Sequence, residues 1–212
     1  MNLEFIRRRF TPDWQRRATR AMQVFLGGLV LFGLYEPNPK VIINASLALA
    51  ITFAPAILAR NYRVSLDPWL ALWVTAAVFL HTLGSAGLYG YLGWWDHLTH
   101  ALSASLIAGI GYITVRALDL HHDEIHLPKR YIFVYIIIFV MAFGVIWELF
   151  EYGLDVVALE TGLEMPLAQH GIDDTVRDMM FNTLGAIVVA TAAQVHLSPT
   201  AEEFRQVLFG DR

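Results

Sequence analysis

No cysteine occurs in this sequence, and charged residues are scarce. The lack of cysteine excludes disulfides, thiolate metal sites, iron–sulfur clusters and cysteine nucleophiles. Charged residues make up 16% of the 212 positions, whereas soluble domains have about 25%. The formal net charge of −4 is not the basic surplus of a nucleic-acid-binding protein, so we expect no nucleic-acid partner.

Apolar residues, by contrast, make up 56% of the chain and occur in long runs that contain no Lys, Arg, Asp or Glu. A helix needs roughly 20 mostly apolar residues to cross a bilayer. These runs predict an all-α integral membrane protein, a single domain that forms a bundle of six transmembrane helices. The expected spans are, in chain order, about residues 18–35, 41–60, 68–88, 96–116, 131–154 and 176–197.

Basic residues predict the orientation of the bundle, because they accumulate on the cytoplasmic side of membrane proteins. If the amino terminus is cytoplasmic and the six spans alternate, only Lys40 and Arg177 of the fifteen Lys and Arg residues fall outside. An odd number of spans would break this pattern. We therefore expect a multi-pass protein of the plasma membrane with both termini in the cytoplasm.

The segments that flank the spans carry interfacial patterns. Residues 1–17 mix arginines with apolar and aromatic residues, which is typical of a segment lying on the inner leaflet. Thr200 and Glu203 have capping-box spacing, so we expect a short carboxy-terminal helix over residues 200–209. Tryptophans and tyrosines near the ends of spans, such as Tyr89, are expected to anchor the membrane interfaces.

Polar side chains are concentrated where four of the expected spans reach the outer face of the membrane. Residues three or four positions apart share one face of a helix, so the members of each local group lie side by side. Charged groups at this depth are costly in lipid and turn to the bundle interior or to a wet cavity. The residues that we expect at this level are His81, Asp96, His97, His100, Glu148, Glu151, Asp178 and Asn182.

Several adjacent carboxylates cannot all be ionised without a compensating cation. A divalent metal ion would supply that charge, with carboxylates and neutral imidazoles as ligands, and the sequence does not distinguish Zn, Mn, Mg or Ca. Glu148 would act as an acid or a base, Asp96 would orient a histidine, and Asn182 would hydrogen-bond the substrate or a carboxylate. These three are the predicted catalytic residues, and the predicted metal ligands are His81, His97, His100, Glu151 and Asp178.

Three motifs in this region share a family resemblance, and they are, in chain order, Asp96-His97-Leu98-Thr99-His100, Glu148-x-x-Glu151 and Arg177-Asp178-x-x-x-Asn182-x-x-Gly185. Their order and spacing, over about residues 90–190, resemble the VanZ-like and YjdF-like families of small polytopic membrane proteins, and the resemblance implies that architecture. The sequence departs from the VanZ-like pattern at His97, where that family has lysine, and at Glu151, where it has glutamine. The loop between Asp155 and Asp174 is also longer.

The cluster favours a membrane-embedded enzyme, metal-assisted and hydrolytic, that acts on an amphiphilic or envelope substrate among membrane lipids. The same carboxylates would also suit an ion- or proton-coupled transporter, although the inner half of the spans holds few polar residues. A lipid-binding protein without catalysis and a buried polar network that only ties helices together are the other interpretations. The run His121-His122-Asp123-Glu124-x-His126 also contains ligand residues, but such local clusters match metal-site patterns by chance, so we interpret it as a loop.

Overall fold

The computed structural model describes residues 14–62, 68–122, 126–162 and 171–210, and these residues form helices joined by short turns, without strands. Five helical segments are long and apolar enough to cross a membrane, and a sixth is counted if a bent pair of helices at the carboxyl end forms one span. The all-α membrane architecture is therefore confirmed. The count of six spans and their orientation remain predictions. Residues 1–13 of the expected interfacial segment lie outside the described residues, and residues 14–17 are helical.

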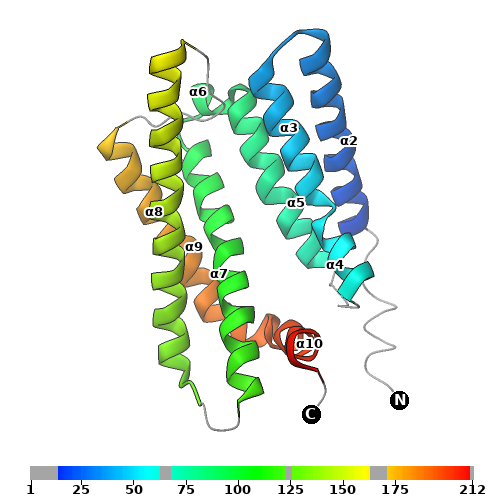
Figure 1. Ribbon diagram of the computed structural model, residues 1–212, viewed down its shortest axis with the longest axis vertical. Helices are drawn as coiled ribbons and strands as arrows, with labels where there is room; N and C mark the ends of the chain where they lie inside the picture. Colours follow the sequence, from blue (N-terminus) through cyan, green and yellow to red (C-terminus); the bar gives the residue numbers. More distant parts are fainter. Residues whose placement is uncertain (1–13, 63–67, 123–125, 163–170, 211–212) are drawn as a thin grey trace.

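The helices form two groups with a further helix across one end (Figure 1). The first group consists of α2 (Trp14–Tyr35), α3 (Pro39–Thr52), α4 (Ala54–Tyr62) and α5 (Pro68–Leu83). The second group consists of α7 (Trp95–His121), α8 (Lys129–Thr161) and α9 (Ile172–His196). Helix α10 (Ser198–Phe209) crosses the end where α2 begins, opposite the start of α7.

The second expected span corresponds to one candidate span, Pro39–Asn61, whose helix is interrupted at Phe53. We expected one helix over about residues 41–60, but α3 ends at Thr52 and α4 begins at Ala54. Pro55 explains the break, because proline has no backbone N–H to donate to the carbonyl of Ile51 and its ring crowds that carbonyl.

The expected outer end of the third span is also helical. A π-helical turn, η1 (Gly84–Leu88), follows α5, and the backbone kinks within it at Gly87 before the short helix α6 (Tyr89–Tyr91). Gly87 has a φ of 145°, a value that glycine adopts without a steric penalty. A Cβ at Gly84 would collide with the ring of Tyr89. Glycine at position 84 therefore allows the ring to fold back against the bundle, instead of pointing to the membrane interface as expected.

The sixth expected span bends sharply at its end. Helix α9 begins at Ile172 and ends at His196, and α10 follows at an angle of 86°. Pro199 favours this arrangement, because proline has no backbone N–H with which to continue α9 and fits the first turn of a new helix. The carboxy-terminal helix therefore begins at Ser198, two residues before the expected capping box.

The second group of helices contains the main core. Tyr112, Ile136 and Val140 are buried there among small residues of α7 and α9. Helices α7 and α9 pack closely at Gly185, where a Cβ would collide with the carbonyl oxygen of Ala101. This contact holds the first turns of α7 beside α9, which is where the polar residues lie.

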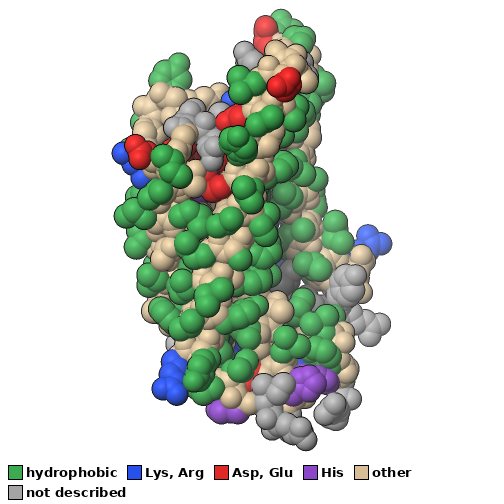
Figure 2. Space-filling view, turned by 60° about the vertical axis from the view of Figure 1, so that its left-hand side comes forward, with side chains coloured by type: hydrophobic (Ala, Val, Ile, Leu, Met, Phe, Trp, Pro, Cys, Tyr) green, Lys and Arg blue, Asp and Glu red, His purple; other side chains and the backbone are tan. Residues whose placement is uncertain are grey.

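The outward face of α8 is apolar along most of its length. Ile138, Ile146 and Leu149 are each more than 60% exposed, at 62%, 61% and 65%. Figure 2 shows hydrophobic side chains over the middle of this face, with acidic side chains gathered toward the upper end. Such a surface suits contact with lipid, because a soluble monomer rarely exposes large contiguous apolar patches.

Candidate functional site

Three ligand-type side chains meet where α7 begins against α9. Asp96 lies in the first turn of α7 and His100 one turn later, while Asp178 lies in the second turn of α9. Nε2 of His100 is 3.7 Å from Oδ1 of Asp96 and 3.7 Å from Oδ1 of Asp178, and the three ligand atoms lie within 4.8 Å of one another. Ligand atoms about 2.0–2.6 Å from one ion are at most about 4–5 Å apart, so this triad has the spacing of a cation site.

Two buried carboxylates at this site have oxygen atoms without a hydrogen-bond partner among the described residues. Asp178 is 2% exposed, and its Oδ1 has no hydrogen-bond partner among the described residues. Glu148 is 5% exposed, and neither of its carboxylate oxygens has such a partner. Asp178 interacts electrostatically with Asp96 and with Glu148. A buried polar atom without a partner is costly, and a bound ion, an ordered water or protonation of the carboxyl group would remove that cost.

The two buried glutamates of α8, Glu148 and Glu151, lie one turn apart and make different contacts. Glu148 lines a pocket of about 360 Å³ between α8 and α9. Glu151 is 8% exposed, and its Oε1 accepts a hydrogen bond of 3.0 Å from Nε1 of Trp147. Glu151, which the sequence suggests as a metal ligand, thus lies outside the triad and has a side-chain donor of its own.

Asn182 follows Asp178 by one turn on α9, is 6% exposed and lines the large cavity described below. Helix α8 approaches it at Gly144. A Cβ at this glycine would lie 3.1 Å from Nδ2 of Asn182 and 2.9 Å from the sulfur of Met179. Glycine therefore allows α8 to lie against the amide of Asn182.

The other two predicted imidazole ligands lie outside the triad. Nδ1 of His81 is 2.8 Å from the hydroxyl oxygen of Tyr89, which is 3.2 Å from Oγ1 of Thr99. The ring of His97 stacks on Phe181 with a distance of 4.3 Å between ring centroids. The structure thus brings together only His100 and Asp178 of the five predicted ligands, and adds Asp96, for which the sequence suggested an orienting role.

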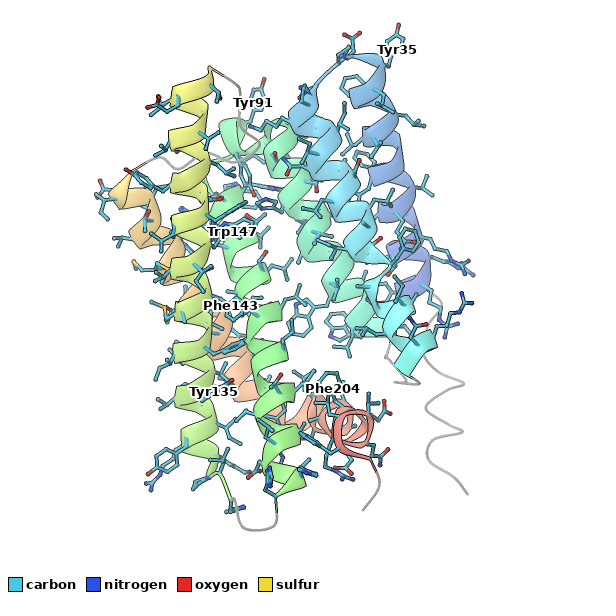
Figure 3. All side chains as sticks on the ribbon, in the orientation of Figure 1. Tyr35, Tyr91, Tyr135, Phe143, Trp147 and Phe204 are labelled. Atoms are coloured by element: carbon cyan, nitrogen blue, oxygen red, sulfur yellow. The ribbon has the colours of Figure 1, made fainter. Side chains whose placement is uncertain are left out.

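A cavity of about 1450 Å³ extends from this polar region to α10. His81, His100 and Asn182 line its polar end, and Phe204, Val207 and Leu208 of α10 line the opposite end. The lining between them is apolar for the most part and comes from α3, α4, α5, α7 and α8. Phe143 and Trp147 extend into this space from α8, and Phe204 extends into it from α10 (Figure 3).

Tyr89 and Thr99 contact the site, although neither stands out in the sequence. Tyr89 has the pattern of an interface anchor, and Thr99 is one polar residue in a helical motif, yet it is 1% exposed and bonded to Tyr89. Gly84 is the one sequence signal for Tyr89, because a residue without a side chain five positions earlier makes room for the ring. That signal has meaning only once the π-helical turn is known.

The histidine-rich run at the other end of α7 has no group of three ligands among its described members. His121 stacks on Phe209 of α10 with ring centroids 3.9 Å apart, and His122 contacts His121 edge to face. Asp123 and Glu124 lie outside the described residues. The described ring contacts of this run are therefore packing contacts within the run and with Phe209 of α10.

Comparisons with known proteins give a family. No solved structure matches the chain. A protein of Thermotoga maritima, described as an uncharacterized protein, is 22% identical over 178 residues, which cover 83% of this chain and 88% of that protein. Residues 18–199 match a family described as "Predicted membrane protein (DUF2238)", and this match includes the triad and nearly all of the described spans. The chain therefore belongs to the DUF2238 family of predicted membrane proteins.

Proposed function

We propose that this protein is a membrane-embedded enzyme that holds a divalent metal ion at Asp96, His100 and Asp178 and hydrolyses an amphiphilic lipid or envelope substrate. The observation that carries the proposal is the position of the triad, which adjoins the polar end of a long apolar cavity. A charged site beside an apolar channel matches a molecule with a polar head and an apolar chain.

The donor set supports the metal. Two carboxylate oxygens and one imidazole nitrogen suit Zn, Mn, Mg or Ca to different degrees, and three protein ligands leave positions for water and substrate. Oδ1 of Asp178, buried without a hydrogen-bond partner among the described residues, is the atom that faces His100. A cation there would give this oxygen a partner and balance the adjacent carboxylates. Such an ion would supply a Lewis acid next to the cavity.

The cavity supports the substrate class. Its volume of about 1450 Å³ exceeds the roughly 300–1,000 Å³ of ordinary small-molecule pockets. No Asp, Glu, Lys or Arg is among its described lining residues, so the chain of the substrate lies in apolar surroundings. Asn182, at the polar end of this cavity, would hydrogen-bond the head group. Glu148 lines the separate pocket between α8 and α9 and is not among the described lining residues of this cavity.

In the proposed orientation, α2 begins in the cytoplasm, α10 lies at the inner leaflet of the plasma membrane, and the triad lies near the outer leaflet. The distribution of Lys and Arg supports this orientation, because only Lys40 and Arg177 of the fifteen fall on the outer side. The substrate head would then sit at the level of the outer head groups, and its chain would point toward the inner leaflet.

The transporter interpretation receives less support. A proton or ion path needs polar groups that continue through the bundle. The buried carboxylates among the described residues are Glu148, Glu151 and Asp178 at one end and Asp119 at the other. Asp119 is held by Arg116 and accepts a hydrogen bond of 2.7 Å from the backbone N–H of Leu127. It therefore fastens the turn between α7 and α8.

The test is turnover in vesicles of phosphatidylethanolamine, phosphatidylglycerol and cardiolipin, with the protein loaded with Zn²⁺ or Mn²⁺ and the lipids followed by mass spectrometry. We expect a hydrolysis product that disappears with a chelator and with His100→Ala. His126→Ala, an exposed histidine at the other end of the bundle, is the control and should keep the activity.

Two results would overturn the proposal. Stoichiometric bound lipid that is never turned over would indicate a lipid-binding protein, and a metal or proton flux without lipid products would indicate a transporter.

A further inference from the structure

We infer that Tyr89 is a positioning residue that holds His81 in the tautomer with its proton on Nδ1, so that Nε2 meets the cavity as a proton acceptor. The tautomer follows from hydrogen bonds alone. The use of Nε2 as a general base rests on the proposed function.

The position of Tyr89 is set by the backbone around it. The π-helical turn η1 and the missing side chain of Gly84 let the phenol ring lie back over the helix. The ring of His81 lies edge to face against Tyr89 and against Trp147, with 5.9 Å between centroids in both pairs. The imidazole is thus held between two aromatic rings that restrict its rotation.

The direction of the hydrogen bonds follows from counting protons. Oγ1 of Thr99 is 2.8 Å from the backbone carbonyl oxygen of Asp96, which can only accept, so the single hydroxyl proton of Thr99 is used there. In its contact with Tyr89, Thr99 must then accept the phenol proton. Because that proton is used in turn, the 2.8 Å contact between Tyr89 and Nδ1 of His81 requires Nδ1 to donate. A neutral imidazole with its proton on Nδ1 has a lone pair on Nε2.

Nε2 has no hydrogen-bond partner among the described side chains, and His81 lines the polar end of the cavity. His81 also lies outside the triad, so the two imidazoles have different roles. His100 binds the metal together with the carboxylates, and His81 faces the substrate. In hydrolysis, Nε2 takes a proton from the attacking water as its oxygen bonds to the substrate. The bond between the substrate and its leaving group then breaks, and the imidazolium gives its Nε2 proton to the leaving group. Tyr89 and Thr99 hold the proton on Nδ1, so that Nε2 is the atom that gains and loses a proton in these steps.

The experiment is two-bond ¹H–¹⁵N correlation NMR on the full chain in lipid nanodiscs, with ¹⁵N-labelled histidine. The chain has eight histidines, and the signals of His81 are those lost in His81→Gln. We expect the Nδ1–H pattern for His81 in the wild type. Tyr89→Phe should populate both tautomers, and Thr99→Val, which frees Tyr89 to donate to Nδ1, should shift His81 toward Nε2–H.

Thr99→Ser keeps the hydroxyl and should restore the wild-type pattern, and Tyr91→Phe, at a residue 86% exposed, should leave it unchanged. An Nε2–H signal for His81 in the wild type would overturn the inference, as would an unchanged Nδ1–H pattern in both Tyr89→Phe and Thr99→Val. Where a lipid product is measured, Tyr89→Phe should lower its rate about tenfold or more with bound lipid unchanged. The expected tautomer without any lipid turnover would overturn the proposed function and leave the positioning role standing.

Discussion

Nε1 of Trp147 donates a hydrogen bond of 3.0 Å to Oε1 of Glu151 one turn further along α8, while the same indole ring packs edge to face on His81 of α5. Trp147 thus connects a buried carboxylate of one helix group with an imidazole of the other. Trp147 and His81 both line the cavity, so this contact joins the two helix groups at the site.

Replacing Trp147 by Phe should leave a buried carboxylate without its donor. A buried acceptor that loses its partner costs about 1–3 kcal/mol, and we expect the free energy of unfolding to fall by that amount in a thermal or denaturant titration. Trp94→Phe, at a residue 56% exposed, is the matched control and should change stability little. If both variants behave alike, the hydrogen bond to Glu151 contributes nothing measurable.

The close crossing of α7 and α9 gives a prediction about packing. Gly185→Ala places a methyl group against the carbonyl oxygen of Ala101, so the helices must separate, and overpacking of this kind costs about 1–3 kcal/mol. Gly153→Ala on α8, where a Cβ meets nothing within 4 Å, should instead raise stability by about 0.5–1 kcal/mol.

Gly185→Ala should also weaken metal binding, because the separation moves Asp178 of α9 away from His100 of α7. Calorimetric titration of both glycine variants with Mn²⁺ checks this. Tight binding by a destabilised Gly185→Ala protein would show that the crossing does not set the geometry of the triad.

The cavity can be blocked without touching the triad. Ile110 lines the cavity and is 54% exposed, so Ile110→Trp should fill part of the space and leave the fold intact. If the tryptophan removes about 1.4 kcal/mol of contact with the apolar chain of the lipid, the affinity of the protein for the lipid falls about tenfold. The change would appear as less lipid bound per protein by mass spectrometry. Ile138→Trp, at an exposed position of α8 outside the lining, should keep the lipid; equal loss in both variants would point to a general effect on the membrane surface.

The spans were predictable because each is a local property of the chain. The length of an uncharged run shows whether it can cross a bilayer, without knowledge of the tertiary structure. Helical spacing alone likewise places Asp96 one turn from His100 on α7. The breaks also have local causes, Pro55 in the second span and Pro199 after the sixth, so they were within reach of sequence reasoning although the expected spans ignored them.

The details of the candidate site depend on packing between segments, which spacing does not specify. The depth at which α7 crosses α9 decides that Asp178 meets His100 while His97 turns to Phe181. Likewise, the π-helical turn after α5 decides that Tyr89 points inward. The large cavity lies between the two helix groups and is lined by residues of both, so no single stretch of sequence predicts it.

The central claim is a cation held by Asp96, His100 and Asp178, and calorimetric titration of the purified protein with Zn²⁺, Mn²⁺, Mg²⁺ and Ca²⁺ tests it most directly. The account predicts one site per chain for at least one of these ions, lost in Asp178→Asn and His100→Ala and kept in Asp173→Asn, an exposed acid on the same helix. A wild-type protein that binds none of the four ions, or an Asp178→Asn variant that binds as well as the wild type, would contradict it.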